Sequence, residues 1–341
     1  YTSAIVYIKS MFAVFLKAVF SLWRQVVDES GTVGGTYLTA MEAIMIKRSV
    51  CAAIFLTLFL FPAALFAGGN TYPCATNYPI VLAHGMGATD DMLGVIDYWW
   101  GIEGALEDEG ATVYVTAVNC MDSTANKALQ FKQQFLQVLA VTGKSKANII
   151  GHSHGTIYTR YAISNLGLSS KVASHTSICG PHRGSAVADV IINVLPDSGE
   201  WLVGAALDVV YAFLLGDTSP NSLANAYDVS RPYMNNVFNP NTPNMSGVYY
   251  QSWATKIKTI TPDLILQPTW LLLLFYEGAN DGLVSVDSAK WGTFRGTEEG
   301  AWWAGGVSHI NAINHFFGVT PGFDAPQFYV DIVSDLKNKG Y

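Results

Sequence analysis

The feature that most constrains the fold of this chain is the pentapeptide G-H-S-H-G at residues 151–155. The four residues before it, 147–150, have the composition of a short buried strand, and residues 156–166 have the pattern of a helix. A sharp turn between a strand and a helix lifts a serine hydroxyl clear of the backbone, and glycines two positions before and after it prevent steric clashes. The pattern therefore predicts Ser153 as a catalytic nucleophile. The alternative is an ordinary strand–helix turn with a solvent-exposed serine.

Strand-like and helix-like segments alternate along much of the chain. Strands are predicted at residues 79–83, 111–118, 172–179 and 268–276, and helices at residues 99–109, 124–141 and 323–337. Residues 221–244 are rich in Asn, Pro and Ser and predict a surface loop. This alternation is typical of the α/β class, with a mostly parallel central sheet that carries helices on both faces.

The front of the chain has the layout of a targeting segment. Residues 45–67 begin with a short basic region, continue as an apolar run and end in small residues. This layout predicts a signal peptide cleaved after Ala67 and a secreted, extracellular protein. A membrane anchor is the alternative, because the apolar run is about the minimum length that spans a bilayer. Residues 1–44 are interpreted as an upstream or non-native extension.

Charge and cysteine usage limit the possible partners. The formal net charge is −7, and no basic run follows residue 67, so the sequence does not favour nucleic acid as a partner. Cys51 lies in the predicted signal peptide, and Cys179 lies in an apolar run typical of a buried thiol. Cys74 and Cys120 flank the first two predicted strands after the signal peptide. They could form a disulfide in an oxidising compartment, but their spacing leaves this open.

An insertion at about residues 185–250 interrupts the alternation of strands and helices. Its first part, residues 186–215, is rich in Val, Leu, Ile and Ala with few charges, which indicates one or two helices with a broad apolar face. These helices are either a buried pair or a mobile lid that covers a site and meets lipid when it opens. No other insertion is indicated, so we expect residues 68–341 to form one domain.

A serine nucleophile needs a histidine to accept its proton and a carboxylate to orient that histidine. In one widespread class these residues follow the serine in the order acid, then histidine. Asp281 fits the acid, because it lies in an N-D-G turn after a run of leucines, although a plain turn aspartate is the alternative. Glu277 and Asp287 are weaker rivals for the same role.

Two histidines follow this turn in the sequence. His309 lies between a stretch of small residues and a helix-like run, and we prefer it to His315 as the base. The attacked carbonyl oxygen becomes an anion, and two backbone N–H groups usually stabilise it. One belongs to the residue after the serine, here His154, and the other to the loop after the first strand, here Met86.

Several segments together resemble the secreted bacterial triacylglycerol lipases typified by the Pseudomonas and Burkholderia enzymes. They are the elbow itself and residues 78–86, 97–102, 113–116, 180–185, 280–284 and 309–314. The resemblance covers about residues 78–320. It implies an α/β-hydrolase fold with a helical lid and a lipase that cleaves triacylglycerols at a lipid–water interface through an acyl-enzyme intermediate. No cofactor is needed for that chemistry. A lipid or other ester is the implied substrate, and a secretion foldase is an implied partner.

The sequence also departs from this family. The family's structural calcium site corresponds here to Asp263, Asn311, His315 and Val319. An amide replaces one carboxylate and an imidazole replaces the amide oxygen, so the resemblance implies a weakened Ca²⁺ site. Asp287 stands where the family has a disulfide cysteine. Two further readings of the function stay open: an esterase, phospholipase or polyester hydrolase acting on other esters, and a non-catalytic hydrolase-like binding protein.

Overall fold

The computed structural model describes seven stretches of the chain: residues 72–86, 91–92, 96–120, 122–192, 222–259, 265–315 and 320–341. The described residues all belong to one compact unit, residues 72–341. Both the predicted signal peptide at 45–67 and the extension at 1–44 lie outside the described residues. Among the helices of the described stretches, none is long and apolar enough to cross a membrane.

A six-stranded parallel sheet forms the centre of this unit, with the strand order β4-β1-β5-β6-β7-β8. The strands are β1 (Ile80–Ala83), β4 (Val113–Thr116), β5 (Ala147–His152), β6 (Val172–Ile178), β7 (Tyr249–Thr255) and β8 (Thr293–Glu298). Two short strands, β2 (Asp91–Met92) and β3 (Ile96–Asp97), pair separately. The predicted parallel sheet is confirmed.

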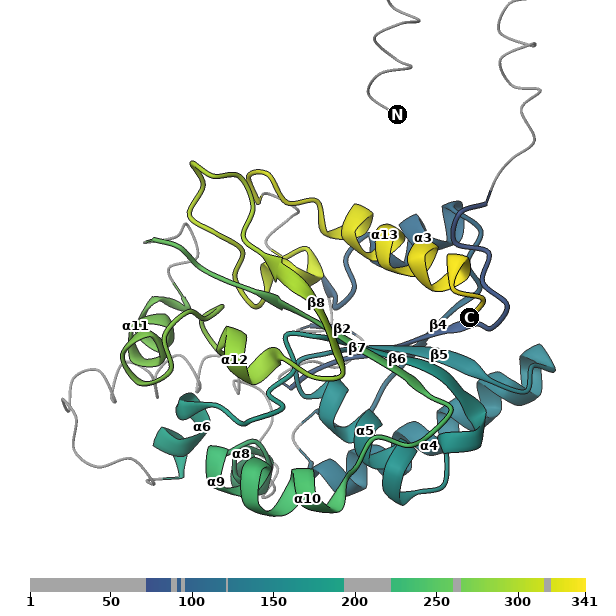
Figure 1. Ribbon diagram of the computed structural model, residues 1–341, viewed down its shortest axis with the longest axis horizontal. Coiled ribbons are helices and arrows are strands. Elements are labelled where there is room, and N and C mark those ends of the chain that lie inside the picture. Colours follow the sequence, from purple (N-terminus) through teal and green to yellow (C-terminus); the bar gives the residue numbers. More distant parts are fainter. Residues whose placement is uncertain are drawn as a thin grey trace, which may run out of the picture. The chain divides into compact units, whose positions relative to one another are not determined.

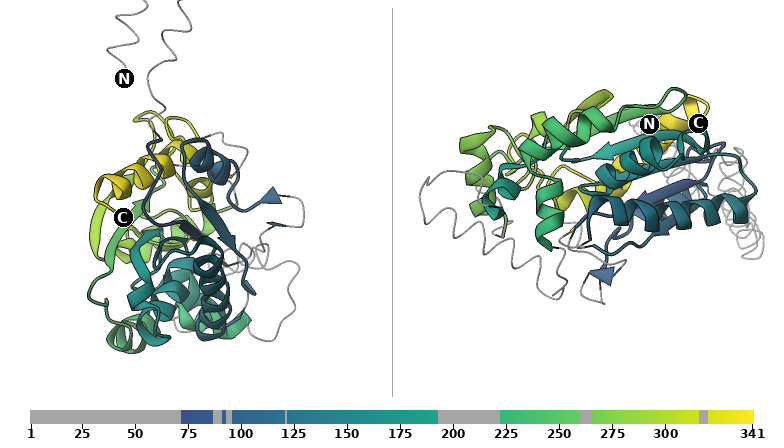
Figure 2. Two further views of the ribbon diagram at one scale, coloured as in Figure 1. Left: turned by 90° about the vertical axis from the view of Figure 1, so that its right-hand side faces the viewer. Right: turned by 90° about the horizontal axis from the view of Figure 1, so that it is seen from below.

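Helices cover both faces of the sheet (Figures 1 and 2). On one face lie α3 (Ile102–Asp108) and α13 (Ala325–Asn338), and on the other lie α4 (Thr124–Thr142) and α5 (Gly155–Asn165). Alternate residues of a strand point to opposite faces. Accordingly, Ile80 and Leu82 of β1 pack in the core with α3 and α13, while Val81 packs with α4 and α5. Because β1 is buried on both faces, it reads as a continuous apolar run.

The leucine-rich segment predicted as a strand at 268–276 is instead a helix, α11 (Gln267–Tyr276). An apolar run of this length is compatible with either element, and four consecutive leucines favour a helix, where an unbranched Cβ loses little rotamer freedom. Pro268 lies in the first turn, where its missing N–H costs no hydrogen bond. The sheet positions that this segment was expected to fill belong to β7 and β8.

The prediction of a surface loop at 221–244 is also wrong. This segment forms the short helices α8 (Ser222–Asp228), α9 (Arg231–Tyr233) and α10 (Asn239–Asn241), with a π-helical turn η2 (Met234–Phe238) between the last two. Met234 and Phe238 are buried against Ile157 of α5. The apolar pair four residues apart was the helical signal, and the abundant Asn and Pro residues obscured it.

The predicted insertion begins with the helix α6 (Ala186–Ile191). Most of the apolar segment predicted as a lid at 186–215 lies outside the described residues, which resume at residue 222, so the lid stays a prediction. The side chains of Cys74, Cys120 and Cys179 are buried, and no disulfide joins the first two, so the bridge that the sequence left open is absent. Cys74 instead packs beside α13, with Sγ 3.5 Å from the carbonyl oxygen of Val330.

Candidate active site

The turn after β5 has the geometry that exposes a nucleophile. Ser153 has φ = 56°, a left-handed conformation that non-glycine residues rarely adopt. The flanking glycines leave room for this turn. A Cβ on Gly155 would lie 2.1 Å from the carbonyl oxygen of Ala83, and one on Gly151 would lie 2.9 Å from the backbone of Gly155. The predicted strand, turn and helix are therefore present, and this backbone accepts no larger residue at either glycine.

Asp281 and His309 meet in a buried pair beside this turn. His309 Nδ1 lies 2.8 Å from Asp281 Oδ2, and the His309 N–H donates to the Asp281 carbonyl at 2.9 Å. Asp281 Oδ1 accepts the N–H groups of Leu283 and Val284 at 3.0 and 2.7 Å. These bonds stabilise the ionised carboxylate, because they satisfy its oxygens away from water.

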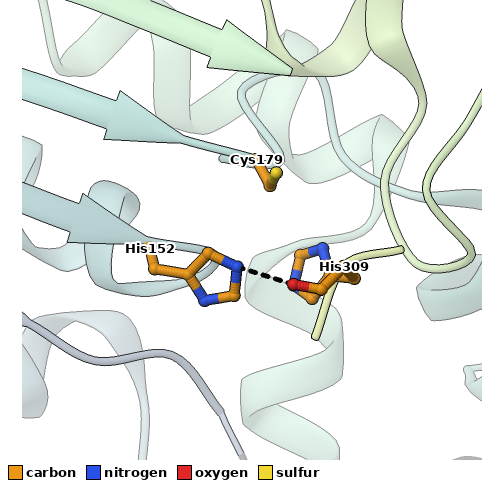
Figure 3. A group of neighbouring side chains, drawn as sticks. All are labelled: His152, Cys179 and His309. Carbon is orange, nitrogen blue, oxygen red and sulfur yellow. Dashed lines mark hydrogen bonds between the residues drawn. The ribbon is translucent and has the colours of Figure 1, made fainter. Parts of the chain in front are cut away.

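The residue before the nucleophile brings the two parts of the site together. His152 Nε2 lies 3.1 Å from the His309 carbonyl oxygen, and the two imidazole centroids are 4.6 Å apart (Figure 3). The turn that carries Ser153 therefore lies directly against the segment that carries His309. The chain thus places the turn of Ser153 beside the Asp281–His309 pair, near the carboxyl end of β5.

The rival acids and the rival histidine have other contacts. Glu277 accepts a hydrogen bond at 2.6 Å from the first N–H of α6. Asp287 is exposed and pairs with Lys290 at 2.5 Å. His315 directs Nε2 to the carbonyl oxygen of Tyr98 at 3.2 Å. Within the described residues, none of these three groups hydrogen-bonds to the Asp281–His309 pair.

The loop after β1 runs against the serine. A Cβ on Gly85 would lie 2.8 Å from the Ser153 Cβ, so Met86 follows a residue that touches the nucleophile. On the other side, His154 is the N-cap residue of α5. The N-terminus of a helix carries unpaired N–H groups and a partial positive charge, which stabilises an anion. Both predicted oxyanion residues therefore border the serine.

The imidazole of His154 is fixed inside the protein. Lys127 Nζ lies 2.9 Å from its Nδ1, and Thr124 Oγ1 lies 2.8 Å from its Nε2. Burial, with the charge of Lys127 as a second cause, lowers the pKa of His154 well below its usual value. This side chain is consequently neutral and serves to hold the residue that follows the serine.

The described half of the predicted calcium site makes protein contacts instead. Asn311 Oδ1 accepts the Ser308 N–H at 3.2 Å, while its Nδ2 donates to the His315 carbonyl. His315 offers nitrogen rather than the oxygen that Ca²⁺ prefers. These two residues do not fit a calcium site. Asp263 and Val319 lie outside the described residues, and the weakened site stays a prediction.

Two side chains of the site were missed by the sequence analysis. Tyr98 and His152 are buried and lie within hydrogen-bonding distance of each other. The histidine inside the G-H-S-H-G motif was a usable signal, but its partner is 54 residues away in the sequence. Cys179, with φ = 52°, lies beside His152 and His309 (Figure 3). Its Sγ is 3.2 Å from Thr255 Oγ1. Its burial agrees with the prediction of a buried thiol.

Several known proteins are similar to this chain in sequence or in fold. Residues 79–229 match the profile of the palmitoyl protein thioesterase family. A triacylglycerol lipase of Vibrio cholerae is 32% identical to this chain over 317 residues, which cover 84% of this chain and 98% of that protein. This chain belongs to the bacterial triacylglycerol lipase family. The lipase is therefore a carboxylic ester hydrolase.

Other relatives agree with this assignment. A triacylglycerol lipase of Burkholderia plantarii is 39% identical, over 48% of this lipase and 45% of its own length. The mature form of the Bacillus licheniformis lipase BlEst2 superposes with a TM-score of 0.55 and 19% identity, covering 72% of this chain and 90% of that one. At that identity the structural likeness shows the α/β-hydrolase fold alone.

Proposed function

We propose that this lipase hydrolyses long-chain triacylglycerols at a lipid–water interface, with Ser153, His309 and Asp281 as its catalytic triad. One observation carries the assignment of the residues. The buried His309–Asp281 pair, joined at 2.8 Å, lies against a strand–helix turn whose serine has φ = 56°. A half-buried serine hydroxyl on a strained turn, beside a carboxylate-oriented imidazole, is the arrangement that activates a serine.

The reaction follows from the proton positions in this pair. Asp281 Oδ2 accepts the Nδ1–H of His309, so Nε2 is left free to act as the base. The Ser153 oxygen attacks the ester carbonyl carbon as its proton passes to that Nε2. The carbon–oxygen bond to the alcohol then breaks, and the same proton goes to the departing alcohol. Water, deprotonated by His309, hydrolyses the acyl-enzyme and regenerates the hydroxyl.

The N–H groups of Met86 and His154 would receive the negative charge on the carbonyl oxygen. Both residues border Ser153, one through Gly85 and the other through the first turn of α5. Donors that are fixed before the reaction stabilise the oxyanion without reorganisation, and losing one generally reduces kcat by about 100- to 1000-fold. Backbone donors also leave the substrate's acyl chain free to vary.

Two features support a lipid substrate. The curated relatives of Vibrio and Burkholderia are themselves triacylglycerol lipases. In addition, α11 exposes apolar side chains such as Phe275 at 77%, and the loop before His309 exposes Trp302 at 90%. Exposed apolar groups of this size favour contact with a lipid surface. Export through residues 45–67, assistance by a foldase and opening of a lid belong to the same proposal.

Activity on esters of graded chain length tests the substrate. The rate should rise sharply when a long-chain triacylglycerol passes its solubility limit and forms droplets. Smooth saturation by a short, soluble ester, with no rise at droplet formation, would favour an esterase instead.

A serine-directed phosphonate tests the nucleophile. It should label the wild type at Ser153, and Ser153→Ala should be neither labelled nor active. Full activity of Ser153→Ala would refute the triad, and failure of the wild type to react would favour a non-catalytic binding protein.

A further inference from the structure

A buried chain of three hydrogen bonds runs behind the nucleophile through two side chains that the triad does not use. The Gly85 N–H donates to the Tyr98 hydroxyl at 2.8 Å. The Tyr98 hydroxyl lies 2.6 Å from His152 Nδ1, and His152 Nε2 lies 3.1 Å from the His309 carbonyl oxygen (Figure 3). These three hydrogen bonds therefore connect the loop before Met86 to the main chain of His309.

Only one arrangement of protons satisfies every atom in this chain. A backbone N–H can only donate, so Tyr98 accepts from Gly85. A carbonyl can only accept, so His152 carries its proton on Nε2. Its Nδ1 is then the acceptor for the Tyr98 hydroxyl proton. Each bond fixes the direction of the next, and such chains strengthen one another in a dry interior.

His152 is held neutral, as this arrangement requires. Burial lowers its pKa well below the usual value, and the nearby His309 acts in the same direction. Protonation of His309 during turnover therefore disfavours a second charge on His152. The three hydrogen bonds therefore keep the same donors and acceptors while His309 gains and loses a proton.

The first and last of these hydrogen bonds hold groups whose small displacements would change the rate of catalysis. At one end, Gly85 precedes Met86 and lies so close to the nucleophile that a Cβ on it would be 2.8 Å from the Ser153 Cβ. At the other, His309 is held from two sides, because its N–H donates to Asp281 and its carbonyl accepts from His152. A displacement of about 1 Å in such groups can reduce the rate about 100-fold.

We propose that Tyr98 and His152 are positioning residues for ester hydrolysis. Together they hold the loop of Gly85 and the main chain of His309 at fixed positions on either side of Ser153. This inference rests on the proposed function of the triad. Neither side chain takes part in bond making or breaking. Their loss should therefore lower kcat, while the binding of the acyl chain, and hence KM, stays nearly constant.

The first test compares two tyrosine hydroxyls in the full-length lipase. Tyr98→Phe keeps the ring but leaves the Gly85 N–H and His152 Nδ1 without this partner. Tyr329→Phe is the matched control, because its hydroxyl is equally buried and has no hydrogen-bond partner among the described residues. We expect kcat to fall about 10- to 100-fold in Tyr98→Phe alone, with KM within about twofold. Equal kcat values in the two variants would overturn the proposal.

The second test separates hydrogen bonding from packing at His152. In His152→Gln the amide oxygen can accept from Tyr98 and the amide N–H can donate to His309, whereas His152→Leu keeps bulk but neither group. The Gln variant should retain about tenfold more kcat than the Leu variant. If Leu matches or exceeds Gln, the role is packing and the proposal fails. This pair decides the question even if Tyr98→Phe does not fold.

A double variant tests whether the two residues act together. Tyr98→Phe with His152→Leu should lose no more kcat than the worse single variant, because either change already breaks the chain. Multiplied losses would show independent roles and overturn the proposal. The phosphonate separates this failure from failure of the proposed function: if the wild type is labelled at Ser153 but the Tyr98 and His152 variants react at the wild-type rate, only the positioning role is wrong.

Discussion

The two halves of the site are built in different ways. Ser153 is placed by regular structure, between the end of β5 and the start of α5, and glycines on both sides admit the turn. Asp281 and His309 lie in irregular segments and are placed by hydrogen bonds, six of which involve Asp281. The nucleophile half therefore depends on backbone packing, whereas the acid–base half depends on polar contacts.

This difference predicts how each half fails. A change in the acid–base half should remove activity and spare the fold, because the sheet does not depend on it. A change at the elbow should damage the fold first, because its neighbours are the backbones of two central strands.

Asp281→Asn should reduce kcat about 10,000-fold. An amide in place of the carboxylate can donate a hydrogen bond to His309 Nδ1, which favours the tautomer with its proton on Nε2, where the base must be free. The size of the loss is that of the equivalent change in serine proteases. The unfolding midpoint in urea should change little. Asp287→Asn is the control, because that carboxylate is exposed and contacts Lys290, and it should keep kcat within about twofold. Comparable losses in both variants would contradict the assignment of the acid.

Gly155→Ala should destabilise the fold by about 3 kcal/mol, since its Cβ would lie 2.1 Å from a backbone oxygen that cannot move aside. The free energy of unfolding in urea measures this. Gly104→Ala is the matched control: it lies in α3 and is exposed, and nothing described lies within 4 Å of the new Cβ. It should gain about 0.5–1 kcal/mol. A Gly155→Ala protein of wild-type stability would contradict the dependence of the elbow on backbone packing.

The sequence specified the nucleophile half more fully than the acid–base half. The strands β1, β4, β5 and β6 were predicted in kind, and β1 gives the clearest case, because it is buried on both faces and is an unbroken apolar run. No strand was predicted at β7 or β8, where Gln251 and Ser252 of β7 and Gly296 of β8 interrupt the apolar pattern. Their place in the sheet is set by pairing with neighbours distant in the sequence, which no local pattern records.

The N-D-G turn at Asp281 is the part of its sequence signal that the structure confirms. Asn280 Oδ1 accepts the Gly282 N–H at 2.8 Å within that turn, whereas the leucines before it form a helix and not the predicted strand. The Tyr98–His152 contact shows the limit of such signals. Its partners come from different elements, and only the folded chain brings them together.

Acid should weaken the nucleophile half selectively. The buried histidines there are His152, His154, His175 and His182, and burial lowers the pKa of each, that of His175 to about 3. A histidine with a lowered pKa in the fold binds more protons when unfolded. Stability is therefore fully present above the unfolded pKa of about 6.5 and is lost as the pH falls below it. For His175 this amounts to about 2 kcal/mol between pH 7 and pH 5.

His175→Gln tests this prediction at one position. The ring bonds to Thr159 Oγ1 at 2.8 Å through Nε2, and its buried Nδ1 has no partner among the described residues. A glutamine keeps one polar contact and cannot be protonated in this range. Urea unfolding at pH 7, 6 and 5 should show a shallower loss of stability in the variant, by about 2 kcal/mol at pH 5. A parallel pH dependence in the two proteins would mean that His175 does not contribute, and that acid acts on the polar contacts of the other half.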